Sequence, residues 1–271
     1  MNFTHLHVHS QYSVLDGMSK VTDLVDKCLR TGMNAIALTD HGNMYGIKEL
    51  LDYCKTLKEP FKPIVGCETY CARRGRHSMS NEEAISPEGK TYIIDRSGWH
   101  LILLAKNKQG YKSLCKLCSI AFTDGYYFSP RIDKKVLEQY HEGLIVCSAC
   151  LGGEIPQLIM HGDLEAAEAS VLWFKNLFGD DYYIELQRHQ TDKPNSATDT
   201  YERQQKVNEV LVQLARNHNI KIIATNDVHY IEREDAFTHK VLLCIQTGNK
   251  ITEKNPLEFK TEEFYLKDGT E

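Results

Sequence analysis

Short apolar runs alternate with longer stretches of helical periodicity along this 271-residue chain, and this alternation constrains the fold more than any other feature. Strands that alternate with helices are typical of βαβ units, whose strands lie parallel in one sheet. The predicted strands are residues 3–10, 34–38, 63–70, 100–106, 143–148, 182–187 and 220–225, and the predicted helices are residues 21–30, 45–57, 111–122, 164–178, 201–217 and 235–245. Seven such strands favour an α/β fold with a closed or nearly closed barrel.

Two polar stretches interrupt the alternation. Residues 73–98 are mixed in charge and weakly patterned, so we expect a long surface excursion from the barrel. Residues 188–199 form a similar but shorter stretch, and the periodic pattern weakens after Gly248. The regular domain is therefore expected to cover residues 1–248, with residues 249–271 outside it.

The charge and the cysteine content narrow the classes of function. The net charge of −5 supplies no global basic field for nucleic acid, so a polyanionic substrate would need metal ions or local cations. Nine cysteines, an odd number in a long chain, do not fit a secreted disulfide framework. No apolar signal sequence follows Met1, and no apolar run is long enough to cross a membrane. A reducing, cytoplasmic compartment without membrane attachment is expected.

Residue types that bind metals gather where the predicted strands end. His7 and His9 have the i, i+2 spacing that places both side chains on one face of a strand, and the pair at 227 and 229 repeats it after the last strand. The candidates at strand ends are His7, His9, His41 after Asp40, Glu68, His100 at the start of its strand, Cys150, Asp227 and His229. Active sites of parallel α/β barrels lie at the C-terminal ends of the strands.

One histidine in a strand is more often a structural residue than a ligand, but so many candidates at one edge predict a metal site. Imidazole, carboxylate and thiolate groups suit zinc, with manganese and iron as alternatives. Glu68 is the candidate bridge, because one carboxylate can contact two neighbouring metal ions. A cluster of divalent ions acidifies water and clamps the oxygens of a phosphoryl group, so the sequence predicts hydrolysis of phosphoesters.

Other residues carry weaker signals. Arg131 and Lys106 are candidates for phosphate binding, although a solvated or structurally paired cation explains each of them equally well. The basic cluster Arg73–His77 could contact nucleic acid, but such a cluster is more often a solvated loop. The Cys-x-x-Cys pairs at 115–118 and 147–150 are not expected to form a zinc ribbon, because the first lies in a helical pattern and the two are too far apart.

The same residues carry a family resemblance. The chain resembles the PHP (polymerase and histidinol phosphatase) family, and within it the branch at the N-terminus of bacterial replicative DNA polymerases of the polymerase III alpha type. The segments that carry the resemblance are residues 3–10 with 15–17, 37–46, 63–68, 100–107, 126–133, 148–155, 224–230 and 242–247. The segments that contain Cys150 and Asp227 make the polymerase branch more specific than the pair His7 and His9 alone.

The resemblance implies a distorted seven-stranded (βα)7 barrel that holds two to three divalent metal ions at the C-terminal ends of its strands. By motif, the first ion would be held by His7, His9, Glu68 and Asp227, and these four residues form the catalytic set. The second ion would be held by Glu68, His100 and Cys150. The third ion would be held by Asp16, His41 and His229. Asp16 enters through this match alone, because its own context is that of a turn. None of the nine positions departs from the ligand pattern of the family.

Three functions are compatible with this resemblance. The first is a metal-dependent 3′–5′ exonuclease that proofreads the DNA 3′ end during replication, with the remainder of the polymerase III alpha chain and other replisome subunits as partners. Residues 249–271 would then begin the connection towards the polymerase region. The second is a metal-stabilised structural domain of the polymerase with little activity. The third is a free-standing phosphatase of small phosphomonoesters, which the polymerase-type segments disfavour.

Overall fold

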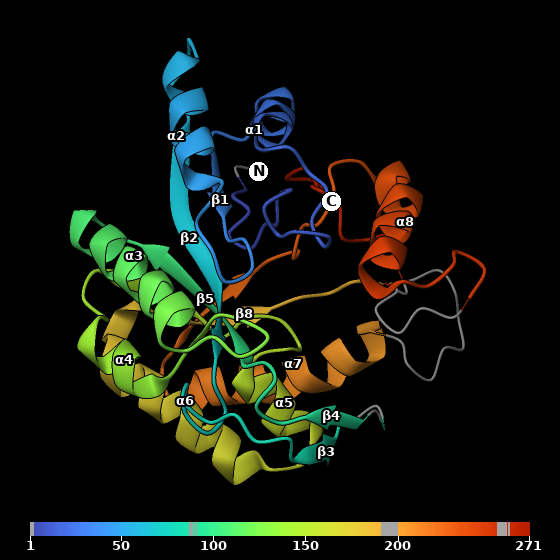
Figure 1. The fold of residues 1–271 in the computed structure, drawn as a ribbon. Coiled ribbons are helices and arrows are strands. Elements are labelled where there is room, and N and C mark those ends of the chain that lie inside the picture. Colours follow the sequence, from blue (N-terminus) through green and yellow to red (C-terminus); the bar gives the residue numbers. More distant parts are fainter. Residues whose placement is uncertain (1–2, 87–88, 90, 191–199, 254–258, 260) are drawn as a thin grey trace.

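A curled sheet of seven strands forms the centre of the computed structural model, which describes residues 3–86, 89, 91–190, 200–253, 259 and 261–271 (Figure 1). The strands run in the order β1 (Ala35–Leu38), β2 (Lys62–Cys71), β5 (Trp99–Ala105), β7 (Leu144–Cys147), β8 (Tyr182–Leu186) and β9 (Lys221–Ala224), and β6 (Arg131–Ile132) pairs with β2 beside this path. The predicted α/β class is confirmed.

Strand β5 runs antiparallel to both of its neighbours, β2 and β7, whereas the pairs β1–β2, β7–β8 and β8–β9 are parallel. The expectation of a wholly parallel sheet is therefore wrong at β5. No helix lies in the described part of residues 72–98, so the helical crossover that joins parallel neighbours is missing between β2 and β5. As a result, the first residues of β5 lie at the same rim as the C-terminal ends of β1, β2 and β7.

The predicted first strand is an extended segment that joins the two edges of the sheet. His5 bridges Ile36 of β1, and Val8 bridges Val228 in the segment after β9, both in the parallel sense. The amide of His9 donates to the carbonyl of Val228 at 2.7 Å. This segment therefore brings the first and last parts of the chain together at one rim.

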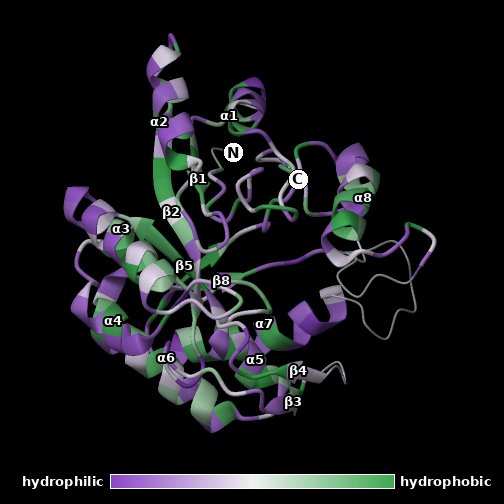
Figure 2. Cartoon of the chain, viewed as in Figure 1, coloured by the Kyte–Doolittle hydropathy of each residue, from purple (hydrophilic) through white to green (hydrophobic). Residues whose placement is uncertain are grey.

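Helices surround the sheet (Figure 1). They are α1 (Val21–Arg30), α2 (Ile47–Thr56), α3 (Lys108–Thr123), α4 (Lys134–Gln139), α5 (Glu154–Met160), α6 (Leu164–Phe178), α7 (Thr200–Asn217) and α8 (Ala236–Thr247), with two short 3₁₀ turns at Gly179–Asp181 and Arg233–Asp235. The predicted bounds of α1 and α6 match the structure, while the short helices α4 and α5 were not predicted. Figure 2 shows mixed polar and apolar surfaces on α2 and α3, as expected of helices that cover an apolar sheet. None of the described helices combines the length and the apolar character of a membrane span.

The excursion predicted at 73–98 is an anchored substructure. It contains the hairpin of β3 (Glu83–Ile85) and β4 (Thr91–Ile93). Asp95, which is buried, accepts hydrogen bonds from the Arg74 guanidinium at 2.7 and 3.0 Å and from the Ser78 hydroxyl at 2.7 Å. The shorter stretch predicted at 188–199 lies largely outside the described residues.

Arg131 holds this excursion against the rest of the fold. Its side chain is 0% exposed, and its guanidinium donates to four backbone carbonyl groups, those of Arg76, Ser78, Asp95 and Gly125. The guanidinium is thus unavailable to a phosphate, so the prediction that Arg131 binds phosphate is wrong and the alternative of a structural cation holds.

Residues beyond the expected boundary at 248 also belong to the fold. The amide of His229 donates to the carbonyl of Phe264 at 2.8 Å, and the amide of Leu266 donates to that of Tyr230 at 3.0 Å. Leu266 is fully buried. The segment 261–267 therefore packs along the chain that follows β9.

We predict that Arg131→Met destabilises the protein by roughly 3 kcal/mol, because four buried carbonyl groups lose a charged donor. Chemical denaturation of both proteins measures this difference. Arg216→Met, at an exposed position on α7, is the matched control and is expected to change the stability little. Equal stability of Arg131→Met and the unsubstituted protein would contradict this structural role.

Candidate metal centre

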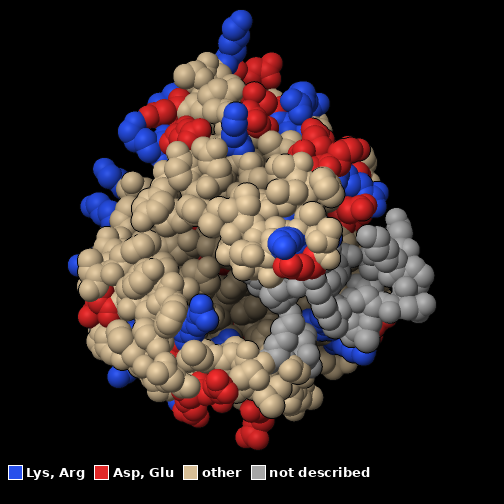
Figure 3. Space-filling model, turned by 45° about the vertical axis from the view of Figure 1, so that its right-hand side comes forward, with Lys and Arg blue, Asp and Glu red and all other residues tan. Residues whose placement is uncertain are grey.

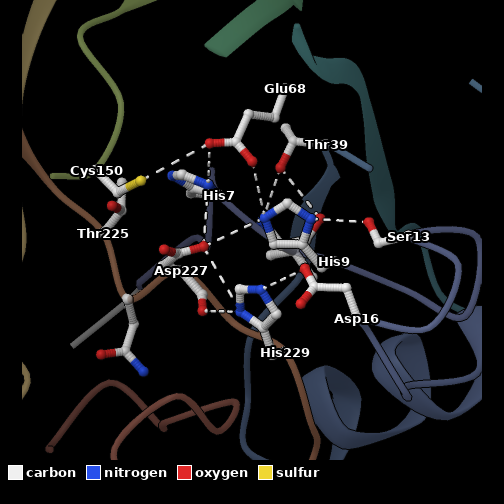
Figure 4. A network of polar contacts seen from close by, with 12 residues as sticks. His7, His9, Ser13, Asp16, Thr39, Glu68, Cys150, Thr225, Asp227 and His229 are labelled. Atoms are coloured by element: carbon white, nitrogen blue, oxygen red, sulfur yellow. Dashed lines mark hydrogen bonds and ion pairs between the residues drawn. The ribbon is translucent and has the colours of Figure 1, made fainter. Parts of the chain in front are cut away.

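Four predicted ligands come from the two extended segments that meet at the rim. His7 and His9 project from the N-terminal segment, and their Nε2 atoms lie 3.1 and 3.2 Å from Oδ1 of Asp227. His229 follows Asp227 by two residues and places its Nδ1 3.7 Å from the same oxygen. The i, i+2 spacing thus directs both pairs to a common centre (Figure 4).

Glu68, in the second half of β2, lies at the centre of the cluster, and its side chain is 1% exposed. Its Oε1 is 2.9 Å from Nδ1 of His100 and 3.3 Å from Nε2 of His7. Its Oε2 is 2.8 Å from Nδ1 of His41. His100 reaches this rim because β5 runs antiparallel. The Sγ atom of Cys150 lies 3.6 Å from Nδ1 of His100 and 4.0 Å from Oε1 of Glu68.

Asp16 completes the cluster on its other side. Its Oδ2 lies 2.9 Å from Nε2 of His41 and 3.1 Å from Nε2 of His229. The structure therefore brings all nine predicted ligands together. Among the described residues, three triads have donor atoms within 4.8 Å of one another. They are His9 with His41 and His229, His7 with His9 and Glu68, and His41 with Glu68 and His100.

Several donor atoms at this centre are buried and have no hydrogen-bond partner in the described part of the chain. They are Nε2 of His7, Nε2 of His9, Nδ1 of His41, Oε2 of Glu68 and Oδ1 of Asp227. Each unsatisfied buried polar atom costs free energy, about 1–3 kcal/mol, and native proteins contain few of them. A cation among these lone pairs would satisfy them together, so the donor set fits divalent metal ions.

Residues outside the predicted set orient the histidines. Oε1 of Glu185, in β8, lies 2.7 Å from Nδ1 of His7, and the Ser13 hydroxyl lies 2.9 Å from Nδ1 of His9. Such partners fix each imidazole with its Nε2 atom directed at the common centre, as they do in histidines that bind metals. Sequence reasoning missed both residues. The signal for Glu185 was a carboxylate inside an apolar strand, while Ser13 carried none.

The charges of the cluster shift its pKa values in opposite directions. Burial opposes a charge on His7, but the carboxylates of Asp227, Glu185 and Glu68 outweigh it and raise the pKa of this imidazole well above its usual value. Burial likewise opposes ionisation of Glu68, yet the neighbouring histidines lower the pKa of its carboxyl well below the ordinary range. Burial and the nearby carboxylates raise the pKa of the Cys150 thiol. A thiolate at Cys150 therefore needs a nearby cation.

The backbone at the site adopts sparsely populated conformations. Leu15, Ala149 and Asp227 have φ values of 63°, 64° and 49°, in the left-handed region that disfavours non-glycine residues. Two of them directly precede the ligands Asp16 and Cys150, and the third is itself a ligand. Strain of this kind persists where the surrounding structure imposes it, and it concentrates at functional sites.

A cavity of about 310 Å³ lies over the cluster. Its lining includes Glu68, His100 and Cys150 together with the apolar residues Leu151 and Phe264. Figure 3 shows a hollow near the centre of one face, with charged side chains mostly around the edges of that face.

Lys106 does not lie at this rim. It follows Ala105 at the end of β5, and because β5 is antiparallel this end lies opposite to His100. Its Nζ atom pairs with the carboxylate of Asp181 at 2.7 and 2.8 Å. The prediction that Lys106 binds phosphate at the metal site assumed that all strands are parallel. Because β5 is antiparallel, this prediction is wrong.

Comparisons with known proteins show the family to which the chain belongs. The model of the PHP domain family matches residues 5–189. DNA polymerase III subunit alpha of Borreliella burgdorferi is 44% identical over 99% of this chain and 22% of its own length, and that of Treponema pallidum is 42% identical over 98% and 21%. The chain thus spans about a fifth of the length of these relatives. A solved structure from Bifidobacterium adolescentis, provisionally named a metal-dependent phosphoesterase, covers 84% of this chain and 88% of its own, with 14% identity and a TM-score of 0.46.

We predict that Glu185→Gln weakens binding of zinc by about 10–100-fold, because the substituted side chain no longer holds the Nδ1 proton of His7 with a charge. Competition against a chromogenic chelator measures the affinity. Glu138→Gln, at an exposed position on α4, is the matched control. Identical affinities of the two variants would contradict the orienting role of Glu185.

Metal binding is also expected to release protons. The pKa values of His7 and Cys150 are raised well above their usual values, so these groups hold protons near neutral pH that a metal ion must displace. The apparent affinity should therefore rise with pH and fall as the solution is acidified. Calorimetric titration with zinc in two buffers of different ionisation enthalpy measures the number of protons released, and heats independent of the buffer would contradict the expectation.

Proposed function

The chain belongs to the PHP domain family, and we propose that its rim cluster is the centre of a metal-dependent phosphoesterase that removes nucleotides from a DNA 3′ end. The observation that carries the proposal is the convergence of nine donor side chains around the shared carboxylate of Glu68, several of them with buried donor atoms that lack a hydrogen-bond partner among the described residues. A full set of donors at one rim is expected of a site that holds two to three metal ions.

The contacts support a division of the donors among the ions. His7, His9, Glu68 and Asp227 would hold the first ion and form the catalytic set, Glu68, His100 and Cys150 the second, and Asp16, His41 and His229 the third. Zinc is the ion that best suits imidazole and thiolate together, with manganese or iron as alternatives. When bound, such ions supply Lewis acidity, which acidifies water and neutralises the charge of a phosphodiester.

The chain's own residues have distinct tasks in this scheme. Glu185 and Ser13 keep Nε2 of His7 and His9 directed at the centre. Glu68 supplies negative charge between the binding positions. Leu151 and Phe264 line the cavity and limit access of bulk water to the reacting ester.

The relatives suggest the setting of this activity. We propose that the domain, a distorted (βα)7 barrel, is part of a cytoplasmic DNA polymerase III alpha chain. The remainder of that chain and other replisome subunits would then present a mismatched 3′ end to the metals for proofreading. The family membership and the long shared stretch with polymerase relatives support this over a free-standing phosphomonoesterase.

A structural role is the second candidate, because several of the proposed ligands are deeply buried. His7 and His9 are 0% exposed and Glu68 is 1% exposed, so metals at this site would also stabilise the fold. On this alternative, chelation lowers the melting temperature while the protein has little nuclease activity at any metal concentration.

Digestion of a primer–template with a mismatched 3′ end tests the proposal. The protein, with zinc or manganese added, is expected to shorten the primer from its 3′ end, and EDTA should abolish the reaction. Asp227→Asn should reduce the rate by at least about 100-fold, because it removes a charged donor of the catalytic set. Asp181→Asn, which changes an acid at the opposite rim, is the matched control and should retain full activity.

If the domain alone is inactive, the same digestion assay on the full-length chain distinguishes the two candidate functions. Activity that appears only in the full chain and disappears with Asp227→Asn would support a nuclease that needs the polymerase to present DNA. Metal-loaded full-length protein without digestion would overturn the proposal in favour of the structural role.

A further inference from the structure

Exposed aromatic side chains gather at the C-terminal end of α3. Tyr45, Phe122 and Tyr126 are 60%, 40% and 53% exposed, although large apolar side chains are mostly buried in folded proteins. The ring centroid of Phe122 lies 6.2 Å from that of Tyr45 and 6.2 Å from that of Tyr126. The three rings therefore form one contiguous patch, which we call the aromatic row. Contiguous exposed apolar patches, unlike single exposed residues, mark interaction sites.

The aromatic row lies at the rim of the metal centre. Helix α3 begins at the opposite rim, where Gly110 lies against the backbone of Ala105 at the end of β5. It ends near β6, because Gly125 lies against the carbonyl group of Arg131. Strand β6 pairs with the part of β2 that follows Glu68. The C-terminal end of α3 is therefore at the rim where the predicted ligands converge.

The segment that carries the predicted ligand His41 also positions the aromatic row. The amide of Tyr45 donates to Oδ1 of Asn43 at 3.0 Å, and the Asn43 side-chain amide donates to the carbonyl of His41 at 2.9 Å. Pro130, in the loop that follows α3, packs so closely on Gly42 that a Cβ atom added there would lie 2.6 Å from its ring. The rings on both segments are thus held beside the metal centre.

The charges around the aromatic row suit a polyanion. Asp124 lies in the sequence between two of the rings, but its carboxylate is occupied by Arg76 at 2.8 Å and faces His77 at 3.1 Å. The guanidinium of Arg96, an exposed residue, lies 4.5 Å above the centroid of the exposed ring of Phe128, in the same loop after α3. Among the described residues no acid pairs with Arg96, so its charge remains available to a ligand.

We propose, on the basis of the function proposed above, that the aromatic row binds single-stranded DNA and leads it to the metal centre. Every base has a π-face, so exposed aromatic rings bind the bases of an unpaired strand by stacking, whatever its sequence. Arg96 on Phe128 supplies a cation for the phosphates beside these bases. The position of the row beside a site that suits phosphodiesters favours DNA as the ligand over an apolar protein partner.

Binding of a fluorescently labelled, nuclease-resistant oligothymidylate, measured by fluorescence anisotropy, tests the proposal. Phe122→Ser and Tyr126→Ser should each weaken binding about fivefold or more, because each removes one stacking surface. Tyr111→Ser, which removes an exposed ring at the other end of α3, is the matched control and should leave the affinity unchanged. All three positions are exposed, so the melting temperatures should change little.

Two further comparisons separate stacking from general apolar contact. Tyr126→Phe keeps the aromatic ring and should retain the affinity for the oligothymidylate. Tyr126→Leu keeps an apolar side chain without a π-face and should weaken binding as Tyr126→Ser does. A fully paired DNA duplex should bind more weakly than the single strand, because its bases already stack on one another.

Four results would overturn the proposal. They are the absence of oligothymidylate binding, an affinity unchanged by both serine substitutions in the row, equal affinities of Tyr126→Leu and Tyr126→Phe, and equal binding of duplex and single strand. The absence of binding would leave a protein partner as the ligand of the row. Because the assay involves no turnover, row-dependent binding by a protein without nuclease activity would support this proposal and overturn the nuclease alone.

Discussion

The buried carboxylate of Glu68 is the charge around which the rim of the sheet is arranged. A single ionised carboxylate in an apolar interior is very costly unless it is surrounded by positive charge or hydrogen-bond donors. Strand β2 lies between β1 and β5, so side chains from both neighbouring parts of the rim can reach Glu68. His41 and His100 contact it from these two sides, and His7 contacts it from the N-terminal segment. The position of Glu68 thus explains why ligands distant in sequence converge.

Cations and carboxylates at this rim depend on one another for their charge states. The pKa of Glu68 is lowered by histidines whose own charge is stabilised by carboxylates, so loss of one member affects the others. The strained backbone at Ala149 and Asp227 adds a further cost that the packing of the rest of the fold must offset. The cluster by itself therefore contributes little to the stability of the folded protein. A bound cation would make this contribution large.

Patterns over a few neighbouring residues predicted those parts of the fold and site that are determined by interactions between residues close in sequence. The amphipathic period of α1 and α6 gave their bounds, and the i, i+2 spacing of His7 and His9 gave a shared direction for their side chains. The antiparallel course of β5 could not be predicted, because it depends on the connection through the excursion. The same error placed Lys106 at the wrong rim. The contact of Glu185 with His7 joins residues 178 positions apart, and no periodicity carries such information.

The order of the ligands along the chain has a consequence for synthesis. His7 and His9 leave the ribosome first, whereas Asp227, His229 and the segment around Phe264 leave last, and the contact of His229 with Asp16 spans 213 positions. Domains fold as units during translation, and contacts between distant residues wait for the later partner. Until Asp227 and His229 have emerged, the growing chain therefore carries incomplete groups of imidazoles and thiols. If the site holds the ions proposed for it, their complete binding must follow the emergence of Asp227 and His229, because a chain that stalls before residue 227 offers only part of the proposed ligand set.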